Sequence, residues 1–216
     1  METVAWRVPP YDNGMYLVID ARGDALLVDP SMGDAEALRA ITERGLRLVE
    51  ILNTHGHPDH IYGNAAVKEA TRARLAIHRL DAYRLSATAR PGISAESRAL
   101  IGGALDTVPE AAADDLIEEG PLGYLRDARL VALHTPGHTE GSTCFHLPDE
   151  GVLFSGDLLF AGNVGRVDLP GGDAALMEAS LRRVAALPPE TRVYPGHGPP
   201  TTIGAELPWL RGFRFG

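Results

Sequence analysis

Three histidines and an aspartate lie within six residues in the segment THGHPDH, which covers residues 54–60 and directly follows an apolar run. Imidazole and carboxylate groups this close together are typical of metal-binding sites. On an extended loop, His55 and His57 are two residues apart and therefore project to the same side of the chain. These two side chains can chelate one metal ion.

Pro58 divides this segment, because proline suits the first position of a helix, where no backbone N–H is needed and φ is already set. The turn that begins there can direct Asp59 and His60 elsewhere, toward a second ion. The alternative is a polar turn whose histidines only form hydrogen bonds or contact solvent. Further ligands elsewhere in the sequence decide between the two interpretations.

Three other segments have the same construction, in which a short strand ends in a loop that contains glycine and a potential ligand. The predicted strands Leu130–Leu133, Gly151–Phe154 and Arg192–Tyr194 are followed by HTPGH, SGD and PGHG, respectively. Glycine allows the backbone to turn closely around a bound ion. Together, four strand ends supply seven candidate ligands: His55, His57, Asp59, His60, His138, Asp157 and His197.

The chemistry of the seven side chains favours two adjacent metal sites. We assign His55, His57 and His138 to one ion, Asp59, His60 and His197 to the other, and Asp157 to a bridging position. Imidazole and carboxylate suit zinc, iron or manganese, and no thiolate is present to select copper or an iron–sulfur cluster. Two divalent ions about 3.5 to 4 Å apart can share a water as hydroxide and polarise a carbonyl. The set therefore predicts a hydrolase.

The elements that must position these loops are short strands mixed with helices. Further strands are predicted over Met15–Ala21, Ala25–Asp29, Leu48–Leu52, Leu75–His78 and Ser142–Leu147. Helices are predicted over Ala35–Arg44, Ala65–Ala70 and Asp81–Leu85, and the first of these is capped by Asp34 and ended by Gly45. Another helix is predicted after the cap Asp173, with a core stripe of Leu176, Met177, Ser180, Leu181 and Val184. This pattern predicts a layered α/β structure with helices outside.

Length and composition are consistent with one globular domain over residues 1–216, with 44% hydrophobic residues. The segment Ser86–Pro121 carries no clear pattern, so it is either a functional loop or lid or a plain solvated connection. The tail aromatics Trp209, Phe213 and Phe215 are expected to pack against the domain, with an oligomer contact as the alternative. The oligomeric state itself does not follow from the sequence.

The formal charge of −9, from 29 acids and 20 bases without a basic run, argues against nucleic acid as a partner. No apolar run of about 18 residues occurs, and the first residues lack a basic segment followed by an apolar one. We therefore expect a cytoplasmic protein without a membrane partner. Cys144 is the only cysteine, which excludes an internal disulfide, and we assign it no chemistry.

The motifs THGHPDH, TPGHTEGS, FSGDLLF and YPGHG resemble those of the metallo-β-lactamase-fold hydrolases, and within them the glyoxalase II-like proteins. The resemblance runs from about Asn13 to Leu207, and the GRVDLPGG loop is similar to that of short bacterial members without the C-terminal helical domain. It implies an αββα sandwich with a binuclear site, zinc first and iron or manganese next, at one edge of the facing sheets. It also implies that the seven candidate residues bind the metals.

The activity that the resemblance implies is hydrolysis of an acylated thiol such as S-lactoylglutathione, with a metal-bridging hydroxide as nucleophile. Asp157 would bridge the metals, and Asp59 would also orient the nucleophilic water through its spare oxygen. A thiolate leaves without strong acid help, since thiol pKa values are about 8.5. We therefore assign no general acid.

Substrate binding is the point at which the chain departs from glyoxalase II proper. Arg166 stands where the family carries a lysine that contacts glutathione, but Asp168 and Pro199 stand where it carries tyrosines. Only 19 residues follow His197, too few for the family's helical extension. These differences argue against the usual form of glutathione binding. We expect Arg166 to bind a substrate carboxylate, with a pairing to Asp168 as the alternative.

Two other functions are compatible with the same residues. Persulfide dioxygenases share the fold and hold one iron at positions that match His55, His138 and Asp157. A metal-binding protein without catalytic activity is the third possibility. The remaining histidines, His78, His134 and His146, are placed outside the site.

Overall fold

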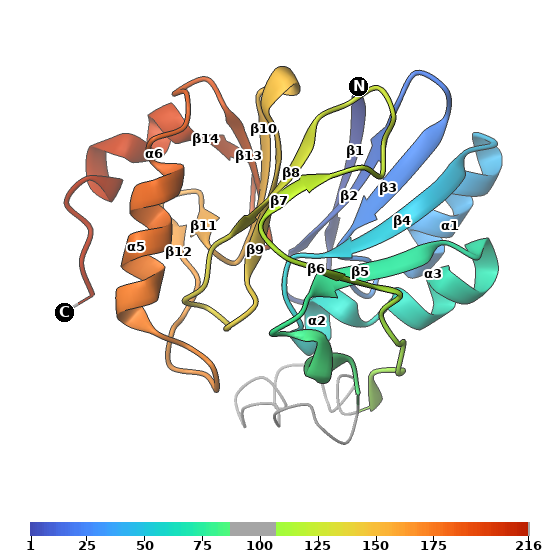
Figure 1. The fold of residues 1–216 in the computed structure, drawn as a ribbon, viewed down its shortest axis with the longest axis horizontal. Coiled ribbons are helices and arrows are strands. Elements are labelled where there is room, and N and C mark those ends of the chain that lie inside the picture. Colours follow the sequence, from blue (N-terminus) through green and yellow to red (C-terminus); the bar gives the residue numbers. More distant parts are fainter. Residues whose placement is uncertain (87–106, 216) are drawn as a thin grey trace.

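The computed structural model describes residues 1–86 and 107–215 and contains two six-stranded sheets that face each other (Figure 1). Sheet A has the order β1 (Glu2–Val8), β2 (Asn13–Ile19), β3 (Asp24–Val28), β4 (Arg47–Asn53), β5 (Arg74–His78) and β6 (Asp115–Ile117). Sheet B has the order β14 (Thr201–Thr202), β13 (Arg192–Pro195), β10 (Val152–Gly156), β9 (Thr143–Leu147), β8 (Leu130–His134) and β7 (Gly120–Leu122). A separate hairpin pairs β11 (Leu159–Phe160) with β12 (Asn163–Val164).

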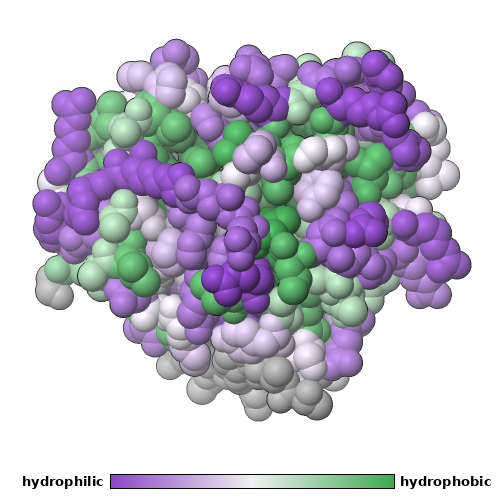
Figure 2. All heavy atoms as spheres, viewed as in Figure 1, coloured by the Kyte–Doolittle hydropathy of each residue, from purple (hydrophilic) through white to green (hydrophobic). Residues whose placement is uncertain are grey.

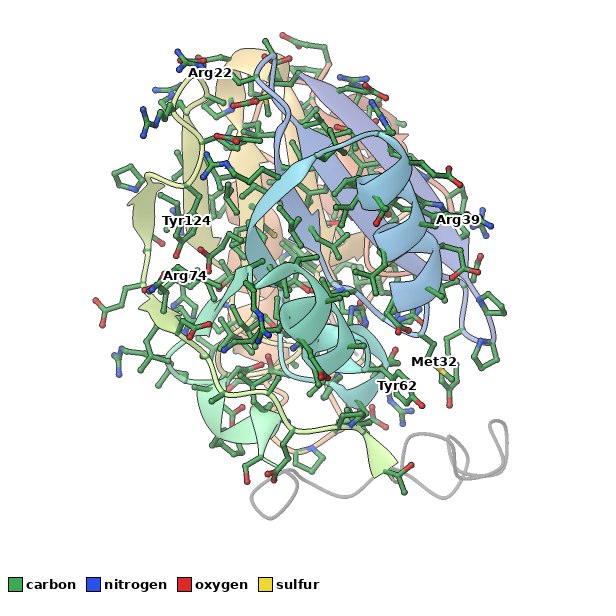
Figure 3. The ribbon with its side chains drawn as sticks, turned by 90° about the vertical axis from the view of Figure 1, so that its right-hand side faces the viewer. Arg22, Met32, Arg39, Tyr62, Arg74 and Tyr124 are labelled. Atoms are coloured by element: carbon green, nitrogen blue, oxygen red, sulfur yellow. The ribbon has the colours of Figure 1, made fainter. Side chains whose placement is uncertain are left out.

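Helices cover the outer face of each sheet. The helices α1 (Asp34–Glu43) and α3 (Asn64–Thr71) cover sheet A, and α5 (Ala174–Val184) and α6 (Ile203–Leu210) cover sheet B (Figure 1). Figure 3 shows α1 and α3 lying side by side in front of sheet A, with Arg39 and Tyr62 at their periphery. The order of layers is therefore helix, sheet, sheet, helix, and the predicted αββα sandwich is confirmed.

Three apolar cores separate the four layers. On β2, Met15, Leu17 and Ile19 pack toward α1 and α3, whereas Tyr16 and Val18 pack between the sheets. Because successive side chains of a strand point to opposite faces, a strand that is covered on both sides is apolar along its whole length. The third core lies between sheet B and α5 and α6.

Hydrophilic residues cover most of the face shown in Figure 2, and apolar residues are visible between them in small patches. Within residues 1–86 and 107–215, no helix has the length and apolar composition that a membrane span requires.

Several predicted details are wrong or incomplete. The N-cap of α1 is Gly33 rather than Asp34, and it forms no side-chain capping hydrogen bond. Leu176 is not a core residue, because it lies in the first turn of α5 and is 46% exposed. The edge strand β1 was not predicted, since its mixed sequence ETVAWRV is only half-buried. The helix α6 was not predicted either, because Pro208 lies inside it.

Other local predictions are confirmed. Asp173 caps α5 by accepting a hydrogen bond from the backbone of Leu176, and Gly45 ends α1 with a φ of +60°. Pro58 occupies the first position of α2 (Pro58–Ile61). Most of the segment predicted as a lid or plain loop lies outside the described residues, so both alternatives stay predictions, as does the single-domain organisation.

The sheet topology brings the candidate ligands to one edge. The strands β3, β4 and β5 run parallel to one another, and β10 runs parallel to β13, so the carboxyl ends within each set meet at the same side. In Figure 1 this edge is the lower one, where α2 lies. The edge therefore collects loops that are far apart in the sequence.

Candidate metal centre

Three imidazoles converge at the first group of predicted ligands, which we call cluster 1 (His55, His57 and His138). His57 Nδ1 lies 3.1 Å from His55 Nε2 and 2.8 Å from His138 Nε2. His57 is the extended residue that precedes α2, as expected for a residue that presents its ring beside that of His55. The three nitrogen atoms are close enough to bind one cation.

The second group, cluster 2 (Asp59, His60 and His197), is equally close. His60 Nε2 and His197 Nε2 are 3.2 Å apart. Asp59 Oδ2 lies 3.5 Å from His60 Nε2 and 3.4 Å from His197 Nε2. The first turn of α2 thus directs Asp59 and His60 to a different centre from the histidines before it, as predicted.

Asp157 lies between the clusters. Its Oδ2 is 3.4 Å from His138 Nε2 of cluster 1 and 3.4 Å from His197 Nε2 of cluster 2. Its Oδ1 lies 3.4 Å from His60 Nε2 and is buried without a hydrogen-bond partner. The structure therefore brings all seven predicted residues together at one place, with Asp157 in the shared position.

These residues fit divalent cations. A buried carboxylate oxygen without a partner has a large desolvation cost, which a bound cation would offset. Gly196 leaves room beside it, since a Cβ there would lie 2.0 Å from Asp157 Oδ1. The only thiol, Cys144, is buried, and burial raises its pKa to about 12. Nitrogen and oxygen donors without sulfur suit zinc, iron or manganese.

Three of the imidazoles are oriented through the ring nitrogen that faces away from the clusters. His138 Nδ1 donates to the carbonyl oxygen of Arg166 at 2.7 Å, and His197 Nδ1 donates to that of Tyr11 at 2.9 Å. His60 Nδ1 donates to Asp29 Oδ2 at 3.0 Å. In the neutral form of each ring this arrangement places the proton on Nδ1, which leaves the Nε2 lone pair available to a cation.

Asp29 was not predicted as a site residue. It accepts hydrogen bonds from the backbone N–H of Thr54 at 2.8 Å and from the Thr54 hydroxyl at 2.6 Å, in addition to the one from His60. It directly follows β3, so a carboxylate at a fifth strand end was the available signal. Asn13 was also missed, and its Nδ2 donates to Asp59 Oδ2 at 2.9 Å.

Arg166 pairs with Asp168, the alternative to its predicted contact with a substrate carboxylate. Its guanidinium donates two hydrogen bonds of 2.7 Å to the Asp168 carboxylate, and both side chains are exposed. The residue nevertheless belongs to the site through its backbone, which holds His138. The interaction with Asp168 holds the pKa of that carboxyl down at about 2.

The histidines excluded from the site lie outside both clusters. The rings of His78 and His134 stack with their centroids 4.1 Å apart and join the end of β5 to the end of β8. His134 Nε2 donates to the carbonyl oxygen of Glu140 at 2.9 Å. Burial, the neighbouring His134 and Arg79 together lower the pKa of His78 to about 4.

The clusters differ in their electrostatics. In cluster 1, burial and the neighbouring imidazoles hold the pKa values of His55 and His57 well below the usual histidine value. In cluster 2, burial opposes protonation but the carboxylates of Asp59 and Asp157 outweigh it. They raise the pKa of His60 to about 9 and that of His197 to about 11.

The carboxyls shift in the complementary direction. Burial alone would raise the pKa values of Asp59 and Asp157, but His60, His197 and, for Asp157, His138 lower them below the usual aspartate value. Both groups are therefore ionised at neutral pH. Two carboxylates among five imidazoles provide the charge that divalent cations require.

Comparison with known proteins agrees with this geometry. A family model described as the metallo-beta-lactamase superfamily matches residues 10–197. An uncharacterised protein of Aquifex aeolicus is 35% identical over 85% of this chain and 83% of its own length. Hydroxyacylglutathione hydrolases of Maricaulis maris and Cereibacter sphaeroides are 35% and 39% identical over 86% of this chain. The chain spans only 62% of the length of these two enzymes.

Solved structures are similar over nearly the whole chain. The B3 metallo-beta-lactamase BLEG-1 has a TM-score of 0.85 and 31% identity, covering 96% of this chain and 97% of that one. The structure of TTHA1623 in a di-iron-bound form has a TM-score of 0.79 and 37% identity, and the match covers 94% of this chain and 96% of that one. The structure of ETHE1 from Myxococcus xanthus has a TM-score of 0.76 and 28% identity, and the match covers 98% of this chain and 85% of that one. The chain therefore belongs to the metallo-β-lactamase superfamily of metal-dependent hydrolases.

Proposed function

We propose that the chain is a glyoxalase II-like thioester hydrolase with a binuclear metal site. The observation that carries the proposal is the position of Asp157, whose Oδ2 lies 3.4 Å from a histidine of each cluster. A carboxylate shared in this way is suited to holding two cations close together. The identity of 35% and 39% to hydroxyacylglutathione hydrolases supports a thioester as the substrate class.

The seven predicted residues are proposed as the metal ligands, with zinc as the first candidate. A structure of TTHA1623 that contains two irons supports a site for two metals and keeps iron as an alternative, with manganese as another. Two bound divalent cations would supply a water with a lowered pKa and would polarise the thioester carbonyl.

The chain's own residues would prepare this chemistry. The hydrogen bonds to Asp29, Tyr11 and Arg166 hold three imidazoles in the orientation that binds a cation. Asn13 donates to Asp59 Oδ2, the oxygen that faces His60 and His197, and so holds this carboxylate in cluster 2. Asp59 would also orient the attacking water. A thiolate leaves readily because of its moderate pKa, so no acid is needed beside the scissile bond.

A persulfide dioxygenase that uses a single iron at His55, His138 and Asp157 is the second candidate, and the likeness to ETHE1 is the observation in its favour. The higher identity to hydroxyacylglutathione hydrolases, 35% and 39% against 28% to ETHE1, favours the hydrolase. The likeness to BLEG-1 adds β-lactams as a substrate class to include in the test.

The test combines metal content with three activities. The protein is purified without added metal and its zinc, iron and manganese are measured by elemental analysis. Thiol release from S-lactoylglutathione, oxygen uptake with glutathione persulfide and hydrolysis of a chromogenic β-lactam are then compared. About two metals per chain with thiol release is the expected result. One iron with oxygen uptake would instead establish the dioxygenase, and β-lactam turnover alone would remove the thioester from the proposal.

A further inference from the structure

Asp81 lies three residues after the end of β5 and is fully buried, yet it lies outside both clusters. Its Oδ2 accepts hydrogen bonds from the backbone N–H of Gly56 and from the hydroxyl of Thr139, both at 2.8 Å. Its Oδ1 accepts one from the backbone N–H of Gly141, also at 2.8 Å. One carboxylate therefore joins a loop of sheet A to a loop of sheet B.

The two loops are those that carry cluster 1. Gly56 separates His55 from His57, and Thr139 directly follows His138. Asp81 therefore forms hydrogen bonds with residues that directly neighbour His55, His57 and His138 in the sequence. Since His57 Nδ1 and His138 Nε2 are only 2.8 Å apart, a small separation of the loops would widen the cluster directly.

The packing at Gly56 and Gly141 has no room for a side chain. A Cβ on Gly141 would lie 2.7 to 2.8 Å from atoms of Asp81, and a Cβ on Gly56 would lie 2.5 Å from Arg84 Cβ. Arg84 is also buried, and its Nε lies 3.4 Å from Asp81 Oδ1, which balances the charge of the buried carboxylate. Its Nη2 donates to Glu140 at 2.6 Å and to the carbonyl oxygen of Pro170 at 2.9 Å.

We propose that Asp81 is a positioning residue for cluster 1, which sets the spacing of His55, His57 and His138 by holding their two loops together. The inference rests on the proposed metal-binding role of the clusters. Cluster 2 has a different support, because Asp29 contacts the ring of His60 itself. Loss of Asp81 is therefore expected to weaken one metal site and to spare the other.

The test measures Zn²⁺ affinity by competition with a chelator in two backgrounds. His197→Ala disables cluster 2 and reports on cluster 1, and His57→Ala disables cluster 1 and reports on cluster 2. Asp81→Asn keeps the shape of the side chain but replaces an acceptor with a donor. We expect it to lower the Zn²⁺ affinity of cluster 1 by about 10- to 100-fold and that of cluster 2 by less than about threefold.

Asp20→Asn is the matched control. Asp20 is also a buried aspartate that accepts two backbone hydrogen bonds, at 2.8 and 2.9 Å, but it lies in the turn between β2 and β3, at the opposite ends of these strands from the clusters. It is expected to lower the thermal stability without changing the Zn²⁺ affinity in either background. A purely structural role for Asp81 would give the same result as this control and would overturn the proposal.

Thr139→Val provides a milder variant in case Asp81→Asn does not fold. It removes one hydrogen bond to Asp81 and keeps those from Gly56 and Gly141. We expect a loss of about threefold to tenfold in the Zn²⁺ affinity of cluster 1. Unchanged affinity would overturn the proposal for Asp81 alone, whereas parent proteins that bind no Zn²⁺ would overturn the proposed function as well.

Discussion

Clusters 1 and 2 both contain histidines but prepare them in opposite ways. Cluster 1 contains imidazoles only, so burial and mutual repulsion keep His55 and His57 neutral. Cluster 2 contains a carboxylate, and in the absence of metal its histidines hold protons well above neutral pH. Metal ligation requires neutral imidazole. His55 and His57 are thus ready to bind a cation at pH 7, whereas cluster 2 must first release protons.

The clusters also differ in how the fold supports them. Cluster 1 is held through the backbone of two loops, which Asp81 joins. Cluster 2 is held through its rings, since Asp29 and the carbonyl oxygen of Tyr11 accept directly from His60 and His197. Different substitutions should therefore affect each cluster separately.

The largest effect is expected at the residue that belongs to both clusters. Asp157→Ala should abolish the loading of both metals and lower kcat/KM by about 10³-fold or more, because several kcal/mol of transition-state stabilisation depend on the metals. Elemental analysis and the thioester assay measure the two quantities. Asp149→Asn, which changes an exposed carboxylate, should leave both unchanged. Full activity of Asp157→Ala would remove the residue from the site.

The pH dependence of metal binding should separate the clusters. The pKa values of His60 and His197 are raised to about 9 and about 11 without metal, so each proton that a cation displaces from cluster 2 adds about a tenfold gain in affinity per pH unit between pH 6.5 and 9. The affinity of cluster 1 should be nearly constant over this range. Metal titrations of the His57→Ala and His197→Ala proteins at several pH values give the slope of metal affinity against pH for cluster 2 and cluster 1, respectively. Equal slopes would contradict the proposed electrostatic difference between the clusters.

Asp29→Asn should act mainly on cluster 2. Loss of the charged acceptor behind His60 is expected to lower the metal affinity of cluster 2 by about 10- to 100-fold. A smaller effect on cluster 1 is expected, because Asp29 also holds Thr54, which precedes His55. Chelator competition in the two single-cluster backgrounds measures both effects. A larger loss of metal affinity at cluster 1 would show that Asp29 supports cluster 1 rather than cluster 2.

The smallest effect concerns a histidine outside the clusters. Burial, together with His134 and Arg79, lowers the pKa of His78 to about 4, below the unfolded value of 6.5, so the unfolded chain binds more protons between these values. The free energy of unfolding should therefore fall by about 2 kcal/mol as the pH drops from 6.5 to 4 on account of this residue. Denaturant titrations of wild type and His78→Gln measure the difference. An NMR titration that gives His78 an ordinary pKa would weaken the argument that burial also lowers the pKa values of His55 and His57 in cluster 1.

The seven predicted residues could be found from the sequence because each has a local signal. His55 to His60 lie in one segment, and His138, Asp157 and His197 each follow a short apolar strand and stand next to glycine or close to it. The layer order also follows from local patterns, since strands buried on both faces are apolar throughout.

The supporting residues could not be found in the same way. Asp81 was predicted only as the start of a short helix, and Asn13 received no role, because their partners are 25 or more residues away in the sequence. Which loop faces them depends on the order of strands in two sheets. The elements β1 and α6 were missed for a different reason, since a half-buried edge strand and a helix that contains Pro208 lack a clear period.

The contacts of His197 have a consequence for synthesis of the protein. Its ring donates to Tyr11, and Gly14 donates to the carbonyl oxygen of Gly196, so the first strands meet a segment more than 180 residues later. Contacts this far apart form late, because the intervening chain must be ordered first. Cluster 1 and the backbone that orients His138 can assemble once residue 166 has left the ribosome, whereas cluster 2 also needs His197. We therefore expect a nascent chain to fill the two proposed metal sites in sequence, with the second marking completion of the fold.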